Sequence, residues 1–172
     1  ALTDKAIDFI KRNKGNPFFL YLPHPQPHVP LFASDKFVGT QKRGLYGDVI
    51  NEIDYSVGRI LMTLKMEKLE EETIIIFTSD NGPWLSYGGH SGSAGIFREG
   101  KGTNWEGGHR VPGIVYYPNK IKANTKIDVP AMGIDWLPTL VEFTHSQSPK
   151  NKIDGASLVP LLTGETDQSP HK

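Results

Sequence analysis

Cysteine is absent from the 172 residues, so the chain has no disulfide framework. A charge excess of one sign is also missing, because 19 lysines and arginines balance 19 aspartates and glutamates. A basic surface typical of nucleic-acid-binding proteins is therefore not indicated, and we expect no nucleic-acid partner. No apolar run approaches the ~20 residues of a transmembrane helix, so we expect no transmembrane segment. The first residues also lack the apolar core of a signal peptide.

Glycine and proline are abundant, in contrast, with 18 and 13 residues respectively. Hydrophobic residues make up 37% of the chain, which is within the range of folded soluble domains. This composition predicts a folded chain with long ordered loops between its core elements. A helical pattern already runs through the first residues, and we expect the chain to be a central fragment of a longer protein.

The apolar pattern predicts an alternation of helices and strands. Apolar residues at helical spacing predict helices, and short β-branched or aromatic runs predict strands. In the clearest predicted helix, Asp48 is expected to face away from the apolar side. This alternation predicts an α/β fold, a sheet covered by helices. The predicted helices are 2–14, 45–66, 135–144 and 157–162, and the predicted strands are 18–22, 73–79 and 113–117.

Two of the predicted strands are followed directly by long loops, at residues 23–43 and 80–110. If these strands are parallel, both loops emerge at the carboxyl edge of the sheet, where α/β proteins bind ligands. The first loop carries His24 and His28 between prolines, which stiffen the backbone. The alternative interpretation is a pair of surface histidines in a proline-rich turn.

The second loop opens with Asp80 and Asn81, whose side chains offer a charged and a neutral oxygen. Both oxygens suit a hard cation such as Ca²⁺, although the same residues are also common in ordinary turns. Further along, Lys101 lies between glycines that allow close approach, and it is suited to bind an anion. The alternative is an exposed lysine on a flexible loop.

Five segments taken together resemble the sulfatases of the arylsulfatase A and N-acetylgalactosamine-6-sulfatase type, especially their bacterial relatives. The resemblance implies an alkaline-phosphatase-like α/β domain, a mixed sheet flanked by helices, of which this chain would be a part. Residues 1–144 would belong to the catalytic domain, and residues 145–172 would connect it to a C-terminal subdomain. The segments are PFFLYLPHPQPHVP, YGDVINEIDYSVGRIL, IIIFTSDNGPW, REGKGTNWEGGHRVP and IDWLPTL.

The resemblance also implies calcium-dependent hydrolysis of sulfate esters. Asp80 and Asn81 match a pair of calcium ligands of the family, which binds one Ca²⁺ ion. Lys101 matches the lysine that contacts the sulfate, and His28 matches the histidine beside the leaving oxygen. The nucleophile in such enzymes is a formylglycine, made by a maturation enzyme from a Cys/Ser-x-Pro-x-Arg motif.

Three further residues are expected to contact the substrate, which would be a sulfated small molecule or polysaccharide. Trp84 is suited to stack on a ring, although an aromatic residue also serves as plain packing. The three expected substrate-binding residues are His24, Trp84 and His90.

The resemblance to the family also implies a periplasmic, secreted or lysosomal location.

The nucleophile motif and the family's early Asp-Asp calcium pair do not occur in the sequence. We therefore expect this chain alone to be inactive by the family mechanism. One alternative is a phosphatase or phosphodiesterase of the same superfold, which would hold transition metals through several Asp and His ligands. The Asp-Asn pair at residues 80–81 favours a hard metal instead. A non-catalytic carbohydrate-binding module is the other alternative.

Overall fold

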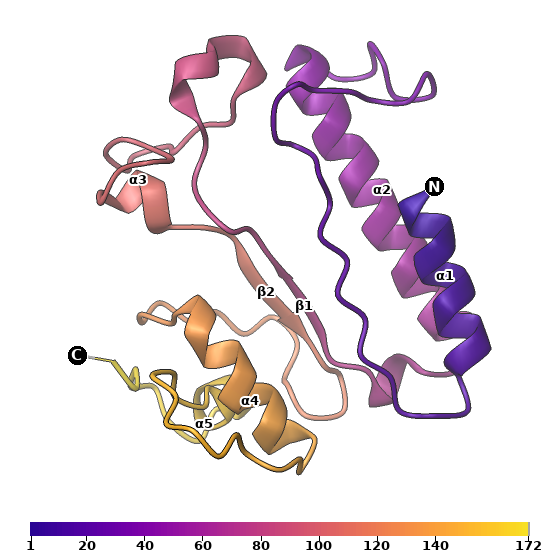
Figure 1. The fold of residues 1–172 in the computed structure, drawn as a ribbon, viewed down its shortest axis with the longest axis vertical. Helices are drawn as coiled ribbons and strands as arrows, with labels where there is room; N and C mark the ends of the chain where they lie inside the picture. The colour runs from indigo at the N-terminus through magenta and orange to yellow at the C-terminus, as the bar shows by residue number, and fades with distance from the viewer. Residues whose placement is uncertain (172) are drawn as a thin grey trace. The chain divides into compact units, whose positions relative to one another are not determined.

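The computed structural model describes residues 1–171 of the chain (Figure 1). The chain divides into two compact units, Ala1–Tyr116 and Tyr117–Lys172, and each is described by itself. The sequence predicted a boundary between the catalytic domain and a connector at residues 144–145. The division into compact units does not test that boundary, which stays a prediction. No helix in the described part of the chain is long and apolar enough to cross a membrane.

Two parallel helices, α1 (Leu2–Asn13) and α2 (Gly44–Met66), form one side of the first unit (Figure 1). The Thr3 and Ser56 hydroxyls are 2.7 Å apart, and the Lys14 ammonium is 2.8 Å from the Glu67 carboxylate. Both pairs join residues 53 positions apart, as parallel helices require. Each helix buries apolar side chains at helical spacing, which confirms the predicted periodicity; they are Ala6, Ile7, Ile10, Val49 and Leu64.

Asp48, in the first turns of α2, is buried, and the expectation that it faces solvent is wrong. Its carboxylate accepts hydrogen bonds from the backbone N–H groups of Gly39, Thr40 and Gln41, at 2.8–3.0 Å. Donation by Gly39 is the main cause that holds the pKa of Asp48 below its ordinary value. The carboxylate therefore fixes the end of the long loop onto α2.

The sheet of the first unit has two antiparallel strands, β1 (Ile75–Thr78) and β2 (Gly113–Tyr116). Ile75 pairs with Tyr116, and Thr78 with Gly113. A 3₁₀ turn, η1 (Glu70–Glu72), precedes β1. Both strands were predicted, and the structure gives them shorter bounds.

The predicted buried strand at 18–22 is wrong as a strand. These residues are extended, but they pair with no strand among the described residues 1–171. Their side chains alternate as a strand's would, yet Phe19 is 76% exposed and Tyr21 is 77% exposed. The apolar run correctly indicated alternating side chains. A β-strand also requires hydrogen bonds to a neighbouring strand, and these are missing among the described residues.

The segment between β1 and β2 is mostly loop, as predicted, with two short helices. A 3₁₀ stretch, η2 (Leu85–His90), follows the Asp-Asn-Gly-Pro turn, and one helical turn, α3 (Glu106–His109), precedes β2 (Figure 1).

The second unit contains η3 (Gly133–Asp135), α4 (Trp136–Phe143) and α5 (Val159–Thr163), close to the two predicted helices. The fully buried carboxylate of Asp135 accepts hydrogen bonds from the N–H groups of Met132 and Ala156, at 2.7 and 3.0 Å. It also lies 2.7 Å from Nε2 of His171. One carboxylate thus joins the start of α4, the segment before α5 and the last described residue.

Candidate active site

Backbone packing between two glycine-containing segments holds the Asp-Asn turn in place. The N–H of Gly82 donates to the carbonyl of Gly108 at 3.0 Å. A Cβ added at Gly82 would lie 1.8 Å from the Gly107 carbonyl oxygen, and one added at Gly107 would lie 1.9 Å from the Glu99 carbonyl oxygen. Only residues without a side chain allow the two backbones to approach this closely.

The same packing fixes the backbone of Lys101. Its N–H donates to the carbonyl of Pro83 at 2.9 Å, and a Cβ at Gly100 would lie 2.3 Å from that carbonyl oxygen. Thr103 closes the turn, since its N–H and its hydroxyl both donate to the Gly100 carbonyl. The Asp-Asn turn and the Gly-Lys-Gly turn therefore lie side by side.

The side-chain oxygens of Asp80 and Asn81 are available to a ligand. No hydrogen bond or ion pair engages either side chain within residues 1–171, and the Asp80 side chain is exposed. Their donor set, one carboxylate and one amide oxygen, fits the chemistry of Ca²⁺. Ca²⁺ takes roughly 6–8 oxygens, however, and the described residues contain no group of three or more Asp, Glu, His or Cys placed to hold a metal. The two side-chain oxygens of Asp80 and Asn81 could fill only part of such a coordination shell.

Two of the predicted site residues, Lys101 and His28, contact the indole ring of a third, Trp84. The ammonium of Lys101 lies over this ring, 4.9 Å from its centroid. The imidazole of His28 lies 5.6 Å from it between ring centroids, inclined at 60°. Tyr87 contacts the same indole, with the ring centroids 4.7 Å apart. The structure therefore brings His28, Trp84 and Lys101 together from three separate segments, beside the turn that carries Asp80.

His24 and His90 are not part of this cluster. No ring contact or hydrogen bond joins either imidazole to it in the part of the chain that the structure describes. His24 is half-buried, and burial lowers the pKa of its imidazole. Their predicted contact with the substrate stays a prediction.

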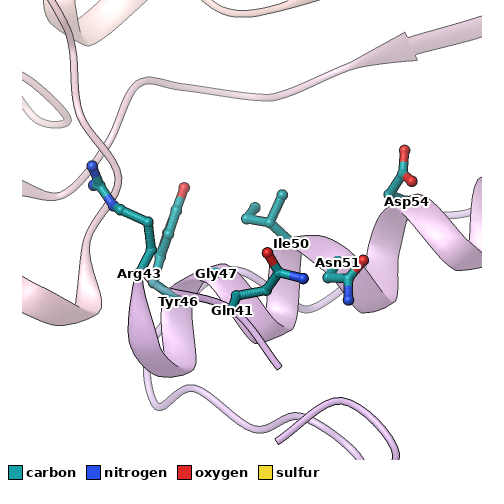
Figure 2. Close-up of a pocket in the computed structure, with 7 residues that line it drawn as sticks. All are labelled: Gln41, Arg43, Tyr46, Gly47, Ile50, Asn51 and Asp54. Atoms are coloured by element: carbon teal, nitrogen blue, oxygen red, sulfur yellow. The ribbon is translucent and has the colours of Figure 1, made fainter. Parts of the chain in front are cut away.

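Tyr46 on α2 was missed in the sequence as a neighbour of the site. Its hydroxyl lies so close to the loop that a Cβ at Gly92 would approach within 2.5 Å. Burial raises the pKa of this phenol. Tyr46 also lines a hollow of about 430 Å³ on the first turns of α2, where Arg43 and Ile50 project from the same side (Figure 2). Helical spacing marked Tyr46 only as part of a helix, and no motif signalled this contact.

The sequence profile of the sulfatase family matches residues 1–146, and the chain belongs to this family. It is 44% identical over 177 aligned residues to the human (Homo sapiens) steryl-sulfatase, covering 99% of this chain and 30% of that protein. It is 41% identical to the dog (Canis lupus familiaris) N-acetylgalactosamine-6-sulfatase, covering 93% of this chain and 31% of that protein. The chain thus spans about a third of the length of these relatives.

Among solved structures, the chain is similar to Ps i-CgsB in complex with k-i-k-neocarrahexaose. The TM-score is 0.89 at 32% identity, covering 99% of this chain and 39% of that one. The predicted family and the predicted fold class, part of an alkaline-phosphatase-like α/β domain, are both confirmed. Sulfatases are generally calcium-dependent.

Proposed function

We propose that this chain supplies part of the active site of an enzyme that hydrolyses sulfate esters. The observation that carries the proposal is that Lys101 and His28 both contact the Trp84 indole, beside the Asp80-Asn81 turn. A cation and oxygen ligands for a hard metal can stabilise the charge that develops on a sulfate group, and an imidazole can protonate the leaving oxygen. Family membership supports the same reaction.

Each residue has a distinct role in this proposal. Asp80 and Asn81 hold one Ca²⁺ ion, which when bound draws electron density from a sulfate oxygen. Lys101 binds the sulfate and offsets the charge that develops on its oxygens in the transition state. The imidazole of His28 gives a proton to the leaving oxygen, which a histidine can do near neutral pH.

The nucleophile is proposed to lie outside these 172 residues, as a formylglycine produced by a maturation enzyme. The sequence contains no cysteine and no Ser-x-Pro-x-Arg segment that could supply it. This chain alone is therefore proposed to be inactive. An export compartment, whether periplasm, exterior or lysosome, is proposed from the family alone.

A sulfated carbohydrate is the proposed substrate class. One similar structure was solved in complex with k-i-k-neocarrahexaose, and another with D-glucosamine-2-N,6-O-disulfate. His24, Trp84 and His90 are the proposed substrate-contacting residues of this chain. Residues 1–144 are proposed to belong to the catalytic domain, with 145–172 as a connector.

The test is an assay of the complete gene product that carries this chain, with sulfate and phosphate esters of the same phenol. We expect hydrolysis of the sulfate ester, loss of activity after chelation, and recovery with Ca²⁺. Asp80→Ala should raise the Ca²⁺ concentration needed for recovery, because it removes a ligand oxygen. Asp35→Ala, at an exposed carboxylate elsewhere in the first unit, is the control. Preference for the phosphate ester would contradict the proposal.

A further inference from the structure

We infer that Trp84 is a positioning residue that holds the Lys101 ammonium and the His28 imidazole in their working places. The inference rests on the proposed function, because it concerns how these two groups are placed for it. Its basis is the geometry around one indole, with the Lys101 ammonium 4.9 Å and the His28 ring 5.6 Å from its centroid.

Lys101 needs such a contact because its side chain is long and flexible. Its backbone is fixed by the 2.9 Å hydrogen bond to Pro83, but four rotatable bonds separate the ammonium from that anchor. No carboxylate forms an ion pair with Lys101 among residues 1–171. The face of an indole attracts a cation without neutralising it. Trp84 therefore orients the ammonium and leaves its full charge for an anionic group.

His28 has the same need, for a different reason. It is exposed, and its Nδ1 lies 2.7 Å from the carbonyl oxygen of the next residue, Val29. That contact within the loop does not tie the imidazole to the rest of the site. The inclined contact with the indole is the one described interaction that does, and such edge contacts are favourable between aromatic rings.

Trp84 is itself held firmly enough to act as a support. Tyr87 packs against the indole at 73° and donates its backbone N–H to the Trp84 carbonyl at 3.2 Å. Three side chains thus contact the ring of Trp84, a residue that is itself 38% exposed. Stacking on a substrate ring, the role predicted from the sequence, would have to share this indole with them.

The experiment separates the two roles with inorganic sulfate, a probe that has no ring. Variants of the complete gene product are compared for inhibition by sulfate and for kcat and KM with an aryl sulfate. Trp84→Leu should weaken sulfate inhibition and lower kcat/KM by about 10-fold each, since one cation–π contact is lost. Trp84→Phe, which keeps an aromatic face, should restore most of both.

Trp105→Leu is the matched control. Trp105 is also partly exposed, and the guanidinium of Arg98 lies over its ring at 3.6 Å. This variant loses a cation–π contact that does not involve Lys101, so both readouts should stay near wild type. If Trp84→Leu leaves sulfate inhibition unchanged and impairs only the aryl sulfate, Trp84 is a substrate platform and the inference is wrong.

A second readout does not depend on turnover. With ¹³Cε-labelled lysine, the Lys101 side-chain resonance, assigned through Lys101→Arg, should lie upfield because it sits over the indole face. Trp84→Leu should abolish this displacement. An unshifted Lys101 resonance overturns the inference even if the protein hydrolyses sulfate esters. Absence of hydrolysis with a shifted resonance overturns the proposed function and leaves the indole contact in place.

Discussion

At the scale of the residue, single glycines determine the geometry of the candidate site. The sequence marked the Gly-Lys-Gly turn and the Asp-Asn-Gly-Pro turn as separate motifs, each with a plain alternative as an ordinary loop. Composition could not reveal that Gly82 and Gly107 touch, because that contact joins residues 25 positions apart in the numbering. Their close approach turns two weak motifs into one site.

Gly82→Ala should therefore destabilise the chain, by about 3 kcal/mol, because its Cβ would lie 1.8 Å from the backbone oxygen of Gly107. Amide exchange at Lys101, whose N–H bonds to Pro83, should accelerate in the same variant. Gly58→Ala, where an added Cβ meets nothing within 4 Å, is the control and should not lower stability. Unchanged Lys101 exchange in Gly82→Ala would show that the two turns are not coupled.

Asp48 shows what residue-level reasoning from spacing cannot see. Helical periodicity assigns polar residues to the solvent face, and this assignment fails where a carboxylate finds backbone donors. Three N–H groups of the loop at 39–41 satisfy Asp48, which makes its burial acceptable. The donors lie in a loop, where the sequence shows no helical or strand periodicity from which their positions could be predicted.

At the scale of the element, the helices were predictable and the pairing of strands was not. Helix periodicity is local, so α1 and α2 follow from apolar spacing within each segment. A strand is defined by its partner, and residues 18–22 have none among those described. The site was expected at the ends of two parallel strands, 18–22 and 73–79, and this arrangement is absent from the described residues because 18–22 forms no strand there. His28 and Lys101 are brought to the same place by their separate contacts with the Trp84 indole.

The second unit depends on one buried carboxylate. Burial of Asp135 alone would raise its pKa, but donation by Ala156, Met132 and His171 outweighs it and lowers the pKa. A lowered pKa in the folded state means that the carboxylate contributes stability above its unfolded pKa of about 3.9. This contribution is lost as the pH falls from there through the folded pKa.

Asp135→Asn should consequently destabilise the second unit by about 2 kcal/mol near neutral pH, because two backbone N–H groups lose a charged acceptor. The measurement is the amide-exchange protection of Ala156 as a function of pH. In the wild type, protection should fall below about pH 4, and in Asp135→Asn this fall should largely disappear. A variant whose acid profile matches the wild type would rule out Asp135 as the source.

At the scale of the whole molecule, family membership was readable from the sequence, whereas the arrangement of the site was not. Segments such as SDNGPW and GKGTNWEGG indicate a sulfatase because their order and context are specific together. The role of Trp84 as the common neighbour of two predicted catalytic side chains is a property of three-dimensional contact. Large apolar side chains also stay exposed in this chain, among them Phe19, Tyr21 and Ile96. No pattern in the sequence distinguishes such positions from core positions.

Lys101 is proposed to bind the sulfate group of an ester that the complete protein hydrolyses. The most direct test is kcat/KM for an aryl sulfate in the complete gene product and in its Lys101→Ala variant. Lys42→Ala, at an exposed lysine in the first unit, serves as the control. We predict a loss on the order of 10²-fold or more in Lys101→Ala, as for removal of one preorganised donor to a developing oxyanion, and none in the control. Wild-type kcat/KM in Lys101→Ala would show that Lys101 has no part in sulfate ester hydrolysis.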